Sequence, residues 1–175
     1  GGRGVAPGIV DGGVKIGEPG ERHRESLRSA AAAAAAGGVT TIVARPDTAP
    51  AIDTPETLEF VTRRAAAPPV RILHMAALTK GREGREMTEI GFLRDAGAVA
   101  FTDAGRVVAD SKVMARAMTY ARGLGTLVVG HPQDPALSAG AAGTAGRIRA
   151  LLGLPAGHPA AARTGPARGR ALAGR

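Results

Sequence analysis

The chain has 175 residues and a formal net charge of +8, with 44% of its residues hydrophobic and 22% charged. These values are typical of one globular domain, and the absence of cysteine excludes a disulfide framework, a thiolate metal site and a cysteine nucleophile. No run approaches the about 18 apolar residues of a membrane span. We therefore expect no membrane partner, and the lack of cysteine is compatible with a cytoplasmic location.

Five apolar runs rich in β-branched residues recur at intervals of about 30 residues. Each run has the length and composition of a strand, and each of the first four is followed by a segment with helical character. The predicted strands are residues 8–16, 40–45, 71–78, 98–103 and 126–131.

Four helices are predicted between these runs, and their ends carry sequence signals. The first ends at Gly37, a residue type that favours helix C-termini. The second opens with Thr54 and Pro55, a capping residue followed by proline at the first helical position. The fourth places an apolar stripe on one face, made by Met114, Ala117, Met118 and Ala121. The predicted helices are residues 21–36, 54–66, 87–96 and 111–122.

Alternating strands and helices of this length predict an α/β fold with a parallel sheet. The spacing alone leaves two architectures open, a doubly wound sheet and part of a (β/α)8 barrel. No G-x-G-x-x-G motif follows the first strand, which disfavours a dinucleotide-binding sheet. We assign residues 1–134 to the strand–helix portion. Residues 135–175 form a tail rich in Ala, Gly and Arg, predicted to be helical or partly disordered and to continue the same unit.

The positive charge is concentrated in this tail. Asp134 is the last acidic residue, and residues 135–175 carry six arginines and no aromatic residue. Nucleic-acid-binding surfaces commonly combine basic residues with aromatic side chains on which bases stack. We therefore predict no nucleic-acid partner, and we interpret the tail as a solvated basic segment or as one that meets an acidic partner.

Five phrases span nearly the whole chain: VAPGIVDGGVKIGEPGERHRESL, AAAAGGVTTIVARPDTAPAID, GAVAFTDAG, VVGHPQDPAL and LLGLPAGHPAAA. In wording, order and spacing they resemble the dihydroorotases of the amidohydrolase superfamily. The resemblance implies a metal-dependent (β/α)8 barrel of the TIM type, of which this chain would hold about five strand–helix units. It also implies zinc-dependent hydrolysis, or closure, of a cyclic amide in pyrimidine biosynthesis.

The positions that correspond to the family's metal ligands are largely changed. The family's first strand ends Asp-x-His-x-His, which aims two imidazoles at one zinc site, and here those positions are Gly13 and Lys15. Glycine has no ligand atom, and an ammonium has no lone pair and repels Zn²⁺. Ala104 stands where the family has a metal-binding Asp, while His131 is retained as a candidate metal ligand. A single histidine does not hold a catalytic zinc ion, so we expect no zinc cofactor in this chain and interpret His131 as a structural residue at a strand end.

Two positions implied to contact substrate also differ. Asp47 replaces the family's Asn and is the candidate substrate-binding residue, although its charge should repel a carboxylate unless Arg45 screens it. Gly17 replaces the Arg that pairs with the substrate carboxylate in the family. His74, inside the third predicted strand, is expected to be a core histidine with its hydrogen bonds satisfied.

Three functions follow from these observations. The first, which we predict, is a dihydroorotase-like protein without catalytic residues or metal that acts as a structural partner of aspartate transcarbamoylase, as some members lacking the His-x-His pair do. It would form an oligomer or hetero-complex through its outer helices and the loops at residues 17–20 and 80–89. The second is an active zinc-dependent dihydroorotase or related cyclic amidase with an altered metal site that includes His131. The third is a remnant or partial sequence, since a complete barrel of this type has about 250 residues.

Overall fold

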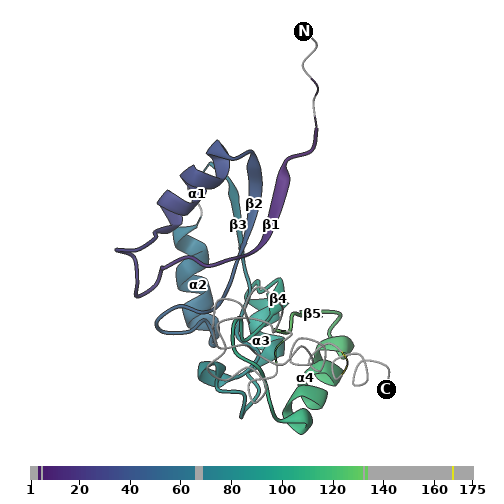
Figure 1. Ribbon diagram of the computed structural model, residues 1–175. Coiled ribbons are helices and arrows are strands. Elements are labelled where there is room, and N and C mark those ends of the chain that lie inside the picture. The colour runs from purple at the N-terminus through teal and green to yellow at the C-terminus, as the bar shows by residue number, and fades with distance from the viewer. Residues whose placement is uncertain (1–3, 5, 66–68, 132, 134–166, 168–175) are drawn as a thin grey trace, which may run out of the picture.

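Five parallel strands follow one another in space in the same order as in the sequence (Figure 1). The structure is a computed structural model that describes residues 4, 6–65, 69–131, 133 and 167. The strands are β1 (Ile9–Val14), β2 (Val39–Ala44), β3 (Arg71–His74), β4 (Ala100–Phe101) and β5 (Leu127–Val128).

The strands form a parallel sheet β1-β2-β3 and a parallel pair β4-β5, which one parallel bridge between Ala76 and Phe101 connects. The N–H of Ala76 donates to the carbonyl of Ala100, and the N–H of Val99 donates to the carbonyl of His74, each at 3.0 Å. The strand order is therefore sequential from the sheet β1-β2-β3 into the pair β4-β5, without the reversal that defines a doubly wound sheet. This order is that of a (β/α)8 barrel, of which the chain forms a part, as predicted.

Each helix lies between two successive strands in the sequence. The helices are α1 (Leu27–Ala36), α2 (Pro55–Arg64), α3 (Ile90–Asp95) and α4 (Ser111–Gly123), and a short 3-10 turn, η1, covers Lys80–Arg82. In Figure 1, α1 and α2 lie together on one side of the sheet β1-β2-β3. This is the side-by-side arrangement of an outer helical layer on a barrel sheet.

Local signals set most of the helix ends. Thr54 caps α2, with its hydroxyl accepting from the N–H of Thr57, and Pro55 is the first helical residue, as predicted. Asp110 caps α4 in the same way. The prediction for α1 was wrong at its start, because residues 21–26 are not helical, with a turn at residues 22–24, and the helix begins only at Leu27, after the cap Ser26.

The core consists of two clusters. One joins α1 to the first three strands; it comprises Ile16, Leu27, Ala30, Ala31, Ile42, Ala44, Val70 and Ile72. The other joins α2, α3 and α4 to β4; it includes Leu58, Val61, Leu78, Ile90, Leu93, Phe101, Val108 and Ala117. Phe101 is the one aromatic residue inside, so aliphatic residues and alanine build this core, as the composition predicts.

The later strands are shorter than predicted. β3 ends at His74 although residues 75–79 continue as a buried segment. The reason is a change of partner: the N–H of Met75 still bonds to Ala44 in β2, whereas that of Ala76 bonds to Ala100 and that of Leu78 to the side chain of Asp103.

Two further predictions concern membrane-spanning helices and the tail of the chain. In the part that the structure describes, no helix is both long enough and apolar enough to cross a membrane. The predicted tail, residues 135–175, lies outside the described residues except for Ala167.

Candidate functional site at the carboxyl ends of the strands

Several polar residues follow directly after the carboxyl ends of the parallel strands. Catalytic groups of (β/α)8 enzymes lie at this end of the barrel. Here Lys15 follows β1, Arg45 and Asp47 follow β2, Asp103 follows β4 and His131 follows β5. The contacts of each residue determine what this end can do chemically.

At the end of β1, Lys15 is engaged by an acid. Its Nζ lies 3.5 Å from a carboxylate oxygen of Glu21, whose other oxygen pairs with Arg24 at 3.0 Å. The lysine side chain is about half exposed, so this surface pair contributes about 0 to 1 kcal/mol. Chemically, the position offers a paired ammonium and no metal ligand.

Gly13 lies on a distorted part of β1. Its φ is +122°, in a region that residues with a Cβ rarely adopt, and the pairing with β2 shifts register between Gly12 and Val14. A Cβ on Gly13 would meet no atom within 4 Å, so the obstacle to a side chain here is the backbone conformation.

The substitution Gly13→His therefore tests whether this strand can accept the family's ligand. We expect it to lower the free energy of unfolding by about 1 to 3 kcal/mol, because the histidine would be held at positive φ. Gly12→His is the matched control, since Gly12 has an ordinary φ and open space around it, and it should change stability little. Equal effects of the two substitutions in urea unfolding would contradict this view of β1.

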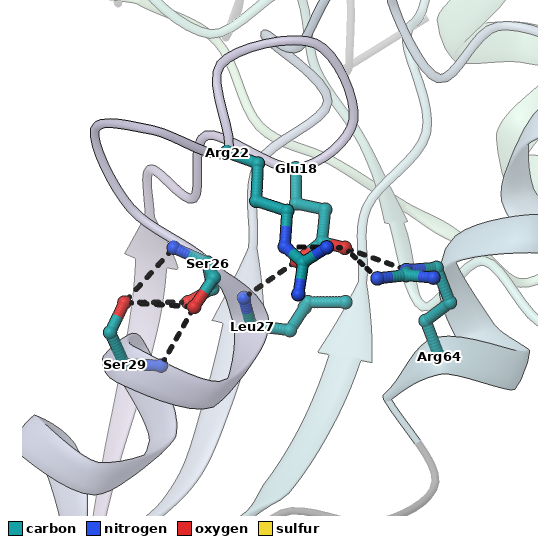
Figure 2. Close-up of polar contacts among 6 residues, drawn as sticks. All are labelled: Glu18, Arg22, Ser26, Leu27, Ser29 and Arg64. Carbon is teal, nitrogen blue, oxygen red and sulfur yellow. Dashed lines mark hydrogen bonds and ion pairs between the residues drawn. The ribbon is translucent and has the colours of Figure 1, made fainter.

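The loop after β1 is held in place by a buried carboxylate (Figure 2). Glu18 is 6% exposed; its Oε2 accepts from the N–H of Leu27 at 3.0 Å, and its Oε1 accepts from Nε of Arg64 at 2.6 Å. Arg22 approaches the same oxygen at 3.9 Å. Burial alone would raise the pKa of Glu18, but the N–H of Leu27 and the guanidinium of Arg64 outweigh it and hold that pKa below its usual value.

Glu18 and Ser26 together satisfy the first N–H groups of α1. Figure 2 shows Ser26 and Ser29 capping the helix reciprocally, beside the bond from Leu27 to Glu18. Glu18 thus joins three segments: the loop, the start of α1 and, through Arg64, the end of α2. Sequence reasoning missed this residue, because Glu18 and Arg64 are 46 positions apart and no local pattern marks either one.

Gly17 is packed against the same loop. A Cβ on this residue would come within 2.4 Å of the carbonyl oxygen of Glu21, and the carbonyl of Gly17 itself accepts from the N–H of Glu21 at 2.6 Å. The arginine that the family resemblance implies at this position therefore does not fit unless the loop changes its path.

At the end of β2, Arg45 and Asp47 form a two-point ion pair. Nε and Nη2 of Arg45 donate to the two carboxylate oxygens of Asp47 at 3.1 and 2.8 Å. Arg45 thus screens the charge of Asp47, as would be needed for Asp47 to lie near a carboxylate substrate. The same contact occupies the guanidinium, so a carboxylate ligand would have to compete with Asp47 for it.

The hydrogen bonds of Asp103 serve to hold the fold together. One carboxylate oxygen accepts from the N–H groups of Leu78 and Thr79, each at 3.0 Å, and the other accepts from the hydroxyl of Thr79. The side chain is buried, and both of its oxygens are used to tie β4 to the segment after β3. Ala104, next in sequence, has φ +53°, a conformation that aspartate tolerates better than most residues do.

The two histidines at strand ends differ in their surroundings. Nε2 of His131 lies 2.8 Å from Oε1 of Gln133 in a partly exposed position. His74 is 3% exposed, and neither ring nitrogen has a hydrogen-bond partner. The expectation that His74 is a satisfied core histidine was therefore half wrong: it is a core residue, but an unsatisfied one. Burial lowers the pKa of His74 from 6.5 to about 4.

The described residues do not fit the family's zinc site. Among residues 4, 6–65, 69–131, 133 and 167, no group of three His, Asp or Glu side chains is placed to hold a metal ion. Gly13 offers no donor atom, Lys15 offers a cation paired to Glu21, and both oxygens of Asp103 are already engaged. No reaction step through zinc can be built on these contacts.

Several known proteins align with most of the length of this chain. The chain matches the Dihydro-orotase-like family over residues 2–165. It is 43% identical over 165 residues to a dihydroorotase from a Sulfurihydrogenibium species, covering 94% of this chain and 39% of the relative. It is 38% identical over 172 residues to the dihydroorotase of Aquifex aeolicus, covering 98% of this chain and 40% of the relative.

A third relative, the dihydroorotase-like protein of Pseudomonas putida, is 40% identical over 161 residues, covering 91% of this chain and 38% of the relative. The chain thus spans about two fifths of the length of these relatives.

A solved structure supports the fold. The chain superposes on the L-hydantoinase (dihydropyrimidinase) from Arthrobacter aurescens with a TM-score of 0.65 and 23% sequence identity. The match covers 75% of this chain and 30% of the hydantoinase, as expected when a partial barrel is compared with a complete amidohydrolase. By sequence, this chain belongs to the dihydroorotase-like family of the amidohydrolase superfamily.

Proposed function

We propose that this chain is part of a dihydroorotase-like protein of pyrimidine biosynthesis that has lost its catalytic metal and serves as a structural partner of aspartate transcarbamoylase. The observation that carries the proposal is the end of β1. There, a lysine paired to Glu21 and a glycine at positive φ stand where the family's two histidines would approach zinc. An ammonium at a position where the family has a zinc ligand repels the zinc ion. Without that ion there is no metal-bound hydroxide to attack a cyclic amide.

The loop after β1 supports the same proposal. The loop at Gly17 leaves no room for the arginine that pairs with the substrate carboxylate in the family. The buried Glu18 holds the same loop against α1 and α2. A loop without the substrate-binding arginine, held in place by a buried glutamate, is suited to a structural role. The proposal therefore assigns the fold's outer surface, and not its strand ends, to function.

Co-migration tests the partnership. Mixed with the aspartate transcarbamoylase of the same organism at micromolar concentrations, the protein should elute from gel filtration in one peak larger than either component. The peak should persist in the presence of a chelator, because no metal is required. Two independent peaks would refute the partnership.

Zinc-dependent hydrolysis is the alternative, and it is favoured by the similarity to relatives that are dihydroorotases. It would need a metal site built without Gly13, Lys15 and Ala104. Turnover of dihydroorotate that depends on added Zn²⁺ would favour this alternative over the structural role.

A further inference from the structure

At the end of β2, Arg45 stands on a firmly held stretch of backbone. Its N–H donates to the carbonyl of Val14, the last residue of β1, at 2.9 Å. The next residue, Pro46, is fully buried, and its carbonyl accepts from the N–H of Ile52 at 3.2 Å. The side chain of Arg45 therefore starts from a fixed position between the ends of two neighbouring strands. This is the end of a (β/α)8 barrel that carries ligand sites.

The guanidinium of Arg45 is occupied by a carboxylate of its own chain. Nε and Nη2 donate to the two oxygens of Asp47 at 3.1 and 2.8 Å, and the Arg45 and Asp47 side chains are 33% and 12% exposed. A planar guanidinium recognises the carboxylate of a ligand through the same two parallel N–H···O bonds. Asp47 thus occupies the position that a ligand carboxylate would take on Arg45.

An ion pair on α3 shows what an ordinary surface contact looks like in this chain. Nε and Nη2 of Arg94 donate to a single oxygen of Asp95, whose side chain is 66% exposed. A pair of that kind is open to water and easily exchanged. The pair at the end of β2 engages both carboxylate oxygens, and its acid is largely covered, so it is harder to displace.

We propose that Asp47 blocks Arg45 and thereby excludes carboxylate ligands from the end of β2. It does so in two ways, because it takes the N–H groups that would bind such a ligand and because its charge repels another carboxylate. Removing the charge of Asp47 should therefore open a carboxylate site on Arg45. The proposal goes beyond the proposed function: it concerns the ligand charge that this strand end accepts and involves neither zinc nor aspartate transcarbamoylase.

Asp47→Asn tests the block, because it removes the charge and keeps the size of the side chain. The probe is succinate, and succinamide, which has the same length and no charge, is the control ligand. Isothermal titration calorimetry on the full chain should show that succinate binds Asp47→Asn at least about tenfold more tightly than the unaltered chain. Succinamide should show no such difference. Asp47→Ser, which also lacks the carboxylate, is the second variant, and circular dichroism checks that each is folded.

Two further variants locate the effect. Asp95→Asn, the same substitution in the exposed pair on α3, is the matched control and should gain no succinate binding. Adding Arg45→Gln to Asp47→Asn should abolish the gain, because the guanidinium is then absent. Labelling with phenylglyoxal, which modifies accessible guanidinium groups, gives a readout without ligand: peptide mass spectrometry should find Arg45 labelled faster in Asp47→Asn than in the unaltered chain.

Three results would overturn the proposal. If the unaltered chain binds succinate as tightly as Asp47→Asn does, Asp47 excludes nothing. If neither Asp47→Asn nor Asp47→Ser gains binding, Arg45 is not a carboxylate site. If Asp95→Asn gains as much as Asp47→Asn, any arginine freed from its acid has the same effect, and the end of β2 is not special. None of these results changes the expected co-elution with aspartate transcarbamoylase, so the two proposals can fail separately.

Discussion

Replacing Glu18 with alanine is expected to lower the free energy of unfolding by about 3 kcal/mol, one of the two largest effects predicted for this chain. The substitution leaves the first N–H of α1 without an acceptor and removes the buried partner of Arg64. The contact to Arg64 joins residues 46 positions apart, so its loss frees the loop from the end of α2. Urea unfolding followed by circular dichroism measures the difference.

Glu21→Ala is the matched control for Glu18→Ala. Glu21 lies in the same loop and pairs with Lys15 and Arg24, but its side chain is 28% exposed and its pairs are at the surface. Its loss should therefore lower the free energy of unfolding by about 1 kcal/mol or less. If both variants were equally stable, Glu18 would not be the brace of the loop.

Acid is expected to destabilise the protein through His74, by about 3 kcal/mol between pH 6.5 and pH 4. Burial lowers the pKa of His74 to about 4 in the folded state, so over this range the unfolded chain binds a proton that the folded chain does not. Stability therefore falls as the pH drops from 6.5 and levels off below about 4, where both states are protonated at this residue. The ring nitrogens have no partner that could stabilise the charge.

His74→Leu separates this residue from the carboxylates that also titrate in acid. The variant should lose the His74 share of the pH dependence, so its stability should decline less than that of the unaltered chain between pH 6.5 and pH 4. His131→Ala, at a partly exposed histidine bonded to Gln133, should keep the full dependence. Parallel pH profiles for the chain and His74→Leu would show that His74 does not control acid stability.

Much of the fold could be predicted from sequence because its signals are local. The apolar runs gave all five strands, and Thr54 with Pro55 gave the start of α2 to the residue. Local signals also produced the errors. The charged residues 21–26 look helical, yet α1 starts at Leu27, where Ser26 caps the helix and Glu18, nine positions earlier, accepts the N–H of Leu27.

The site could be predicted only as a set of positions. The sequence identifies Gly13, Lys15, Asp47, Ala104 and His131 as the positions to inspect, since each corresponds to a residue of the family motif. It does not reveal that Lys15 pairs with Glu21 or that Gly17 faces a carbonyl oxygen, because both contacts depend on the path of the loop. Nor does a histidine inside an apolar strand reveal that both its nitrogens lack partners, which depends on the neighbouring elements.

The zinc content of the purified chain shows whether the catalytic metal has been lost. The chain would be loaded with excess Zn²⁺, dialysed and analysed by inductively coupled plasma mass spectrometry beside its His131→Ala variant. We expect less than about 0.1 zinc ion per chain in both proteins, since a lysine and a glycine stand at the ligand positions of β1. One or two tightly held zinc ions per chain, lost in His131→Ala, would contradict it and restore the case for a metal-dependent hydrolase.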